Sequence, residues 1–484
     1  MFDLFGFILL SVFGSIFTAL ITSSVRHPKP WYVTLKKILL SVSSSSYLNP
    51  EPPVTEKEIF KDIQELAECH ETAAIFAELV HKDGAGAWPP RSNHDHAKWP
   101  PALRPYKEVY EEMAPLLPTT DVSLDDKVNR VRMTQFRSCF AKLLQDKVDL
   151  DQVEKLLKAA EAGRWDIFPR DTYNAFYCCI AWCRHAYRLE WATIPVVRLA
   201  QLEKTVSLPL ELVLPWAYQQ RHFGLASESG NNTSNLVLNF DPSGTYTLKI
   251  NPGLPKRITT SEEAFARIFH DVETLGLPIY HAVINAMLSY ARKDLQSCLA
   301  HTRRITAHLR PLLNAYYDRV HDSRIARSAW LSHVQGFYAW GAGHESEDDT
   351  GEWVKFDGLS GNQVLLFQAL DAFLGIEPYL SEENRRRNVP RRQREFASAV
   401  ERHSFRHSLG REGVEGEIRG EIGEIVRRLR VFRSAHRTRA KAYLLQPAPE
   451  RLPMTAGKSL LKSDMDESLE FLDEFMVGRL AQTV

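Results

Sequence analysis

The chain has 484 residues, of which 44% are hydrophobic and 10% aromatic, so it can fold around large buried cores. Its 60 basic and 60 acidic side chains give a formal net charge of zero, which argues against nucleic acid as a partner because no overall positive field attracts phosphates. Six cysteines in so long a chain do not make a disulfide framework, and they fit a reducing compartment.

The N-terminus holds the most hydrophobic segment of the chain. Leu4–Val25 is a run of 22 residues without charge, long enough to span about 30 Å of hydrocarbon. Asp3 stands where a signal peptide needs a basic residue, and Arg26 and Lys29 follow the run. By the positive-inside rule we expect an uncleaved transmembrane helix over residues 1–30, which anchors a cytosolic body to a membrane such as the endoplasmic reticulum. A cleaved signal peptide is the alternative.

A linker and a small helical domain are predicted next. Ser43–Thr55 is rich in Ser and Pro, which predicts a linker over residues 31–55. The small helical domain is predicted over residues 56–200. Within it, Lys57–Val80 has helical apolar spacing, and Ala175–Trp182 is apolar enough to be wholly buried. No strand pattern of comparable length competes with these helices.

A larger helical domain is expected over residues 201–484. Asn235–Ile250 alternates as a strand would on both sides of Asp241–Gly244, which predicts one hairpin. From Ser261 onward the apolar spacing is helical almost to the end. The predicted helices are Glu262–Thr274, Pro278–Ala291, Asp294–Val320, Gln363–Leu374, Arg391–Leu409 and Glu415–Leu445. The fold class is therefore all-α.

One loop is predicted over Gly341–Gly361. It ends with Gly358-Leu359-Ser360-Gly361, directly before the start of the next helix. A helix N-terminus preceded by Ser and Gly presents free backbone N–H groups, which suit a bound anion or a polarised ligand oxygen. Taken alone, these residues are better explained by an ordinary N-cap.

His436 lies on the apolar stripe of an otherwise highly charged helix. The stripe repeats at steps of three or four residues and comprises Ile418, Ile422, Ile425, Leu429, Phe432, His436, Ala440 and Tyr443. A buried imidazole needs a partner, which is either a hydrogen-bonding group of the core or a metal ion. Arg433, one turn earlier, could pair with a carboxylate beside such a metal, for example a haem propionate.

Three segments carry a resemblance to a known family. Phe356–Ile376 resembles, without gaps, the Gly-rich loop and following helix of the indoleamine 2,3-dioxygenase family, haem enzymes of the tryptophan dioxygenase superfamily. Phe432–His436 resembles the Arg-Ser-x-His segment that carries the family's proximal haem histidine, and Ser207–Leu210 resembles the entry into its distal helices. The likeness covers roughly residues 170–450. Around Phe432–His436 the chain is also similar to monodechloroaminopyrrolnitrin synthase.

The resemblance implies a fold, a cofactor and a set of roles. It implies a helical bundle that encloses haem b, with His436 as the proximal iron ligand. Arg433 would bind a haem propionate and pair with Asp371, while Ser360 and Gly361 would line the distal or propionate side. The implied substrates are O2 and an indole, whose C2–C3 bond is opened by the activated oxygen.

The chain departs from the family where the substrate would bind. Gln335 stands at the family's substrate-carboxylate arginine and Trp330 at its distal phenylalanine. Glutamine carries no charge and cannot make the bidentate pair that a free carboxylate prefers, so free tryptophan is disfavoured. Phe265 and Phe269 would complete an apolar pocket. His270 would be either a distal base or a structural residue.

Three functions follow from these features. The leading prediction is a monomeric, membrane-anchored haem dioxygenase acting on an indole or tryptophan-derived substrate. A haem-dependent rearrangement or mono-oxygenation of such a metabolite is the second. A non-catalytic haem-binding sensor is the third, and it gains if Trp330 and Phe265 close the distal face. Cys178, Cys179, Cys183 and His185 lack the paired spacing of a zinc site and predict core packing instead.

Overall fold

The computed structural model describes residues 55–117, 126–188, 206–338, 343–345, 353–355, 361–444, 454–455, 458–459 and 476–483. Glu56–Val484 forms one compact unit. The predicted anchor, the predicted linker up to residue 54 and the predicted domain boundary at residue 200 lie outside the described residues and stay predictions. Within the described ranges, no helix is both long and apolar enough to span a bilayer.

Helices dominate the described part of the chain, as predicted. The α-helices are α3 (Glu56–Ala67), α4 (Glu71–Lys82), α5 (Arg104–Met113), α6 (Asp126–Lys147), α7 (Leu150–Glu161), α8 (Arg170–Arg188), α10 (Leu210–Phe223), α11 (Asn232–Asn235), α12 (Lys256–Ala291), α13 (Leu295–Arg319), α14 (Arg327–Ala329), α15 (Gln335–Tyr338), α16 (Leu365–Phe373), α17 (Glu382–Asn388), α18 (Arg391–Arg402) and α19 (Gly413–Leu444). A further helix spans 476–482.

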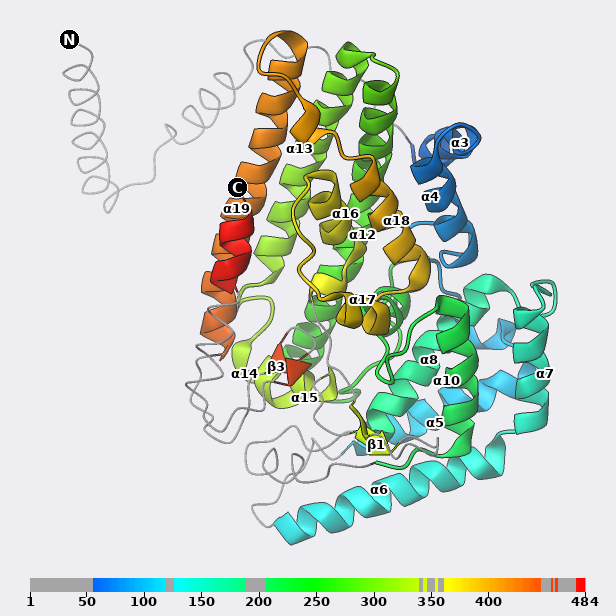
Figure 1. Cartoon of the computed structure of the whole chain (residues 1–484). Helices are drawn as coiled ribbons and strands as arrows, with labels where there is room; N and C mark the ends of the chain where they lie inside the picture. Colours follow the sequence, from blue (N-terminus) through cyan, green and yellow to red (C-terminus); the bar gives the residue numbers. More distant parts are fainter. Residues whose placement is uncertain are drawn as a thin grey trace, which may run out of the picture. The chain divides into compact units, whose positions relative to one another are not determined.

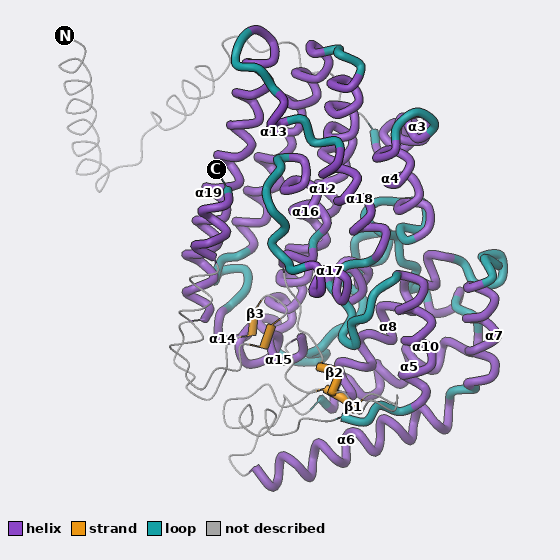
Figure 2. The backbone as a smooth tube through the Cα atoms, viewed as in Figure 1, coloured by secondary structure: helices purple, strands orange, loops and turns teal. Residues whose placement is uncertain are grey.

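Shorter elements connect these helices. The 3-10 turns are η1 (His96–Lys98), η2 (Pro101–Leu103), η3 (Ala114–Leu116), η5 (Val237–Asn239), η7 (Gly361–Gln363) and η8 (Arg406–Ser408), and η6 (Trp330–Val334) is a π-helix. Two short antiparallel strand pairs are present, β1 (Gly343–Glu345) with β2 (Trp353–Lys355) and β3 (Met454–Thr455) with β4 (Lys458–Ser459). Figure 2 shows how little of the backbone these strands occupy.

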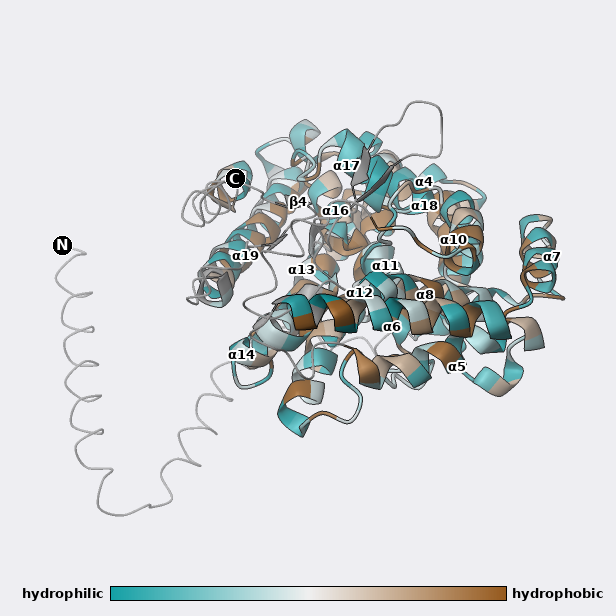
Figure 3. Ribbon diagram, turned by 90° about the horizontal axis from the view of Figure 1, so that it is seen from below, coloured by the Kyte–Doolittle hydropathy of each residue, from teal (hydrophilic) through white to brown (hydrophobic). Residues whose placement is uncertain are grey.

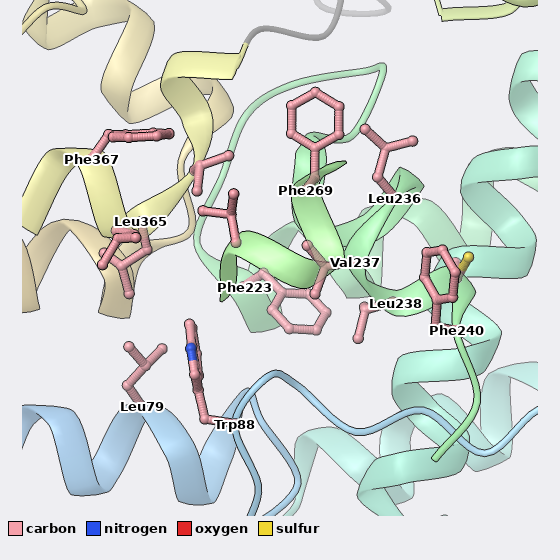
Figure 4. Packing of buried hydrophobic residues seen from close by; sticks show 14 of the residues in the cluster. Leu79, Trp88, Phe223, Leu236, Val237, Leu238, Phe240, Phe269, Leu365 and Phe367 are labelled. Carbon is pink, nitrogen blue, oxygen red and sulfur yellow. The ribbon is translucent and has the colours of Figure 1, made fainter. Parts of the chain in front are cut away.

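Three long helices organise the site. The helix α13 lies between α12 and α19, and α16 packs against α12 and α18 (Figure 1). In a second group of helices, α5 and α10 pack against α8. The helix α8 is buried along nearly its whole length, as predicted for Ala175–Trp182. The more peripheral α6 alternates hydrophilic and hydrophobic positions (Figure 3). One hydrophobic cluster joins both groups, and Figure 4 shows Leu79, Phe223, Phe269 and Leu365 within it.

The two predicted helices Glu262–Thr274 and Pro278–Ala291 are parts of one continuous helix, α12. The sequence predicts a break before Pro278, but α12 continues through it. Proline removes one hydrogen bond to the carbonyl of the residue four positions earlier, here Thr274. Thr274 is exposed, so this side of the helix faces solvent, which can satisfy the freed carbonyl without ending the helix. A single rod thus carries Phe265, Phe269 and Glu273.

For the predicted hairpin at Asn235–Ile250, the prediction of two strands is wrong. The structure has α11 and η5 there, followed by a single bridge between Phe240 and Tyr246. The buried side chain of Asn239 replaces the ladder, because it accepts from Leu248 N (2.8 Å) and donates to Leu248 O (2.9 Å). The turn lies where it was predicted, with Asp241 Oδ1 accepting from backbone nitrogens.

The start of α16 is stabilised by a carboxylate from another helix. The N-cap Val364 has no side chain that can accept a hydrogen bond, and Glu273 of α12 accepts from Leu365 N at 2.9 Å. Tyr280 donates to the other carboxylate oxygen at 2.7 Å. Burial nevertheless raises the pKa of Glu273 to about 7. The cap that fixes α16 relative to α12 is therefore a titrating group.

We expect the protein to lose stability between pH 4.5 and 7 through Glu273. A folded-state pKa above the unfolded value of 4.5 means that the folded chain holds the proton longer, so the free energy of unfolding falls as pH rises through this window. The loss amounts to roughly 3 kcal/mol. Urea unfolding at several pH values measures it. In Glu273→Gln this component disappears, and an unchanged slope in that variant would contradict the assignment.

Candidate haem site

The first five residues of the α19 stripe are buried as predicted, while the last three are partly buried, and α19 packs against α13. Ile418, Ile422, Ile425, Leu429 and Phe432 all lie in the hydrophobic core. The His436 ring is partly buried, and its Nδ1 is buried without a hydrogen-bond partner among the described residues. Burial lowers the pKa of His436 to about 4, so the imidazole is neutral at pH 7. A neutral imidazole with an unpaired nitrogen is suited to bind a metal ion.

Aromatic rings surround this histidine. Phe432 stacks on His436 with centroids 6.0 Å apart, and Phe367 of α16 stacks on Phe432 at 5.5 Å. Tyr316 of α13 approaches the His436 ring edge-on at 5.6 Å. These rings exclude water from one side of the imidazole, which lets a metal–nitrogen bond form in apolar surroundings.

Tyr316 also connects His436 with the predicted distal residues. A Cβ placed on Gly361 would lie 3.8 Å from Tyr316 Oη and 3.9 Å from Phe269 Cε1. The rings of Phe269 and Phe265 meet edge-on with centroids 5.4 Å apart, and the ring centroids of Phe265 and Trp330 lie 6.2 Å apart. Four predicted site residues, Phe265, Phe269, Trp330 and Gly361, are thus brought together across Tyr316 from His436. Ser360 lies outside the described residues.

A π-helix sets the position of Trp330 relative to Gln335. The π-turn η6 runs from Trp330 to Val334, and the half-buried Gln335 follows it directly. The side chain of Asn251 donates to His333 O at 3.0 Å, and Glu262 accepts from that same amide at 2.9 Å. Single π-turns inside helices are frequent at functional sites because they shift side chains out of helical register.

Asp371 and Arg433 form the ion pair that was predicted. Arg433 Nη2 donates to both oxygens of Asp371, at 2.7 and 2.9 Å. Arg433 Nη1 donates to Thr483 Oγ1 at 2.6 Å. A second guanidinium, that of Arg479, also donates to Asp371. The site therefore includes the 476–482 helix.

Sequence reasoning missed Tyr316 and Arg479. Tyr316 follows Leu309 and Leu312 at helical spacing, so its place on the buried face of α13 was readable, although its proximity to His436 was not. Nothing in the sequence marks Arg479. Its partner Asp371 is 108 positions earlier in the chain.

His270 packs away from the distal cluster. Its ring centroid lies 4.4 Å from that of Phe240, and its Nδ1 lies 3.5 Å from Asp271 Oδ1. Both contacts favour the structural role that was one of the two alternatives. In the described ranges no three His, Cys, Asp or Glu side chains are placed to hold a metal ion. Burial raises the pKa of the Cys178 thiol, as expected for a core cysteine.

The family model for indoleamine 2,3-dioxygenase matches residues 203–471, which is more than half of the chain. The matched range includes Phe265, Trp330, Asp371 and His436, whereas Arg479 lies beyond it. No curated protein matches the chain. Because the match spans over half of the chain and includes these residues, the protein belongs to the indoleamine 2,3-dioxygenase family.

Proposed function

We propose that this protein is a haem-dependent dioxygenase that inserts O2 into the C2–C3 bond of an indole or tryptophan-derived substrate. The observation that carries the proposal is the unpaired imidazole of His436, which lies across Tyr316 from the apolar cluster of Phe265 and Phe269. Members of the family use haem, and the residues present fit that group. Haem bound there would supply the iron that activates O2.

The side chains around the haem position have separate tasks in this proposal. His436 binds the iron as a neutral imidazole, and Phe432 and Tyr316 keep water from that bond. Arg433, oriented by Asp371, binds a cofactor carboxylate. On the opposite side, the rings of Phe265, Phe269 and Trp330 would orient the flat apolar substrate and exclude water from it. Ser360 and Gly361 would line the same side.

The distal cluster favours an enzyme over a sensor. Phe265 and Trp330 contact each other, yet both remain only partly buried. Two rings that sealed the distal face completely would both be buried, so their partial burial supports the enzyme over the sensor. The sensor alternative would gain if these two rings closed the distal face completely.

Isotope incorporation distinguishes the three functions. The purified chain is loaded with haem, reduced, and given ¹⁸O2 together with tryptophan, tryptophan amide, tryptamine or indole. We expect a ring-opened product that carries two ¹⁸O atoms. One ¹⁸O atom would establish mono-oxygenation instead, and a rearranged product without ¹⁸O would establish an isomerase-type reaction. Haem binding without turnover of any indole would support the sensor.

Gln335 is proposed to set the preference for substrates without a free carboxylate. Gln335→Arg is expected to raise kcat/KM for tryptophan by roughly tenfold or more, because a charge-assisted hydrogen bond to the carboxylate is worth about 1.5–3 kcal/mol. Tryptophan amide has no carboxylate and serves as the matched substrate, for which kcat/KM is expected not to rise. If the wild type already prefers tryptophan over its amide, the inference from Gln335 is wrong.

A further inference from the structure

The helix at 476–482 brings a second arginine to the Asp371 carboxylate. Arg479 Nη2 donates to Asp371 Oδ2, and its Nη1 donates to Glu377 O at 2.7 Å and to Gln482 Oε1 at 2.9 Å. The buried Thr483, at the end of this helix, accepts from Arg433 and donates to Arg479 O at 2.8 Å. Three segments, α16, α19 and the 476–482 helix, therefore meet at one carboxylate.

The charges in this cluster do not balance. The side chains of Asp371, Arg433 and Arg479 are only 8%, 12% and 7% exposed. Among the described residues, one carboxylate faces two guanidiniums, which leaves one positive charge in a poorly solvated position. Burial lowers the pKa of Arg479, but arginine stays charged in proteins at neutral pH. An uncompensated buried cation is costly, so the cluster is suited to take up one further negative charge.

Among the described residues, the other charged side chains that line the cavity beside Asp371 do not supply that charge. Arg385 and Glu401 line a small cavity of about 30 Å³ that also touches Asp371. Arg385 has its own partner, Glu382, at 3.4 Å. Glu401 is exposed, so water screens it strongly. Within the described residues, the Nε atoms of Arg433 and Arg479 donate no hydrogen bond, so each guanidinium keeps a donor for a ligand.

We propose that Arg479 is a second cofactor-carboxylate residue, which together with Arg433 binds one haem propionate while Asp371 holds both guanidiniums in place. The proposal rests on the proposed function. Arg433 is three residues from His436 on α19, a rise of about 4.5 Å, so a group held by His436 has its edge within reach of the arginines. One excess positive charge matches one carboxylate. The 476–482 helix, which lies beyond the family match, is thereby part of the cofactor site.

The test compares two forms of the cofactor. Full-length apoprotein is titrated with haem and, separately, with haem dimethyl ester, whose propionates carry no charge, and the Soret absorbance reports binding. Arg479→Ala is expected to weaken haem binding roughly tenfold. The affinity for the dimethyl ester is expected to equal that of the wild type. Arg479→Lys keeps the charge and is expected to recover part of the haem affinity.

Controls separate this proposal from a purely structural role and from the proposed function. Val477→Ala, on the exposed side of the same helix, is expected to bind both cofactor forms as the wild type does. If Arg479→Ala weakens both forms equally, Arg479 only ties down the helix and the proposal is overturned. Unchanged binding of both forms also overturns it. A wild type that binds neither form contradicts the proposed function itself.

Discussion

Replacing His436 by alanine is expected to lower the affinity for haem by at least about 100-fold, because the change removes the imidazole that is proposed to bind the iron. The imidazole is neutral at pH 7 and has an unpaired buried nitrogen, so it would bind iron without first losing a proton. Titration of the apoprotein with haem, followed by the Soret band, measures the loss.

A rescue experiment makes this test specific. The alanine variant has a cavity between Phe432 and Tyr316, which free imidazole is expected to enter and so restore the spectrum of the wild type. His308→Ala, at an exposed position of α13, is the control and is expected to bind haem normally. If His436→Ala keeps the wild-type spectrum and affinity, His436 is not the ligand.

Asp371→Ala is expected to destabilise the fold by about 3–5 kcal/mol, because it leaves the guanidiniums of Arg433 and Arg479 buried without a counter-charge. Urea unfolding of the apoprotein at pH 7 measures the change. The matched control is Glu424→Ala, which removes a carboxylate that pairs with two arginines on the more exposed face of α19. There we expect a change of at most about 1 kcal/mol.

Removing all three charges tests the cause of this effect. Replacing Asp371, Arg433 and Arg479 together by leucine is expected to recover most of the lost stability, since no charge then remains buried. The triple variant should nonetheless bind haem more weakly than the wild type. A triple variant as unstable as Asp371→Ala would mean that shape, not charge, is what this cluster contributes.

The features that local patterns determine could be predicted from the sequence. The stripe of α19 follows from helical spacing, and the burial of α8 follows from its composition. The Asp371–Arg433 pair came from the family resemblance, and the structure places the two side chains in contact. In each case the information lies within a few turns of one helix or in a motif.

The remaining features depend on contacts between distant segments, which a single sequence does not record. The continuity of α12 through Pro278 depends on Thr274 lying on the solvent-exposed side of the helix. The π-turn at Trp330 is held by Asn251, about 80 positions earlier. The role of Glu273 as a cap for α16 needs α12 and α16 already packed together. Propensity could not have found any of the three.

The position of Arg479 in the chain has a consequence for biosynthesis. Asp371 and Arg479 are separated by 108 residues, so at ordinary elongation rates the arginine is added roughly 5 to 20 s after the aspartate. During that interval α16 and α19 can form and pack, but the segment that completes their cluster does not yet exist. We therefore expect stable cofactor loading to follow the release of residue 479 from the ribosome, and a nascent chain stalled before that residue to hold haem only weakly.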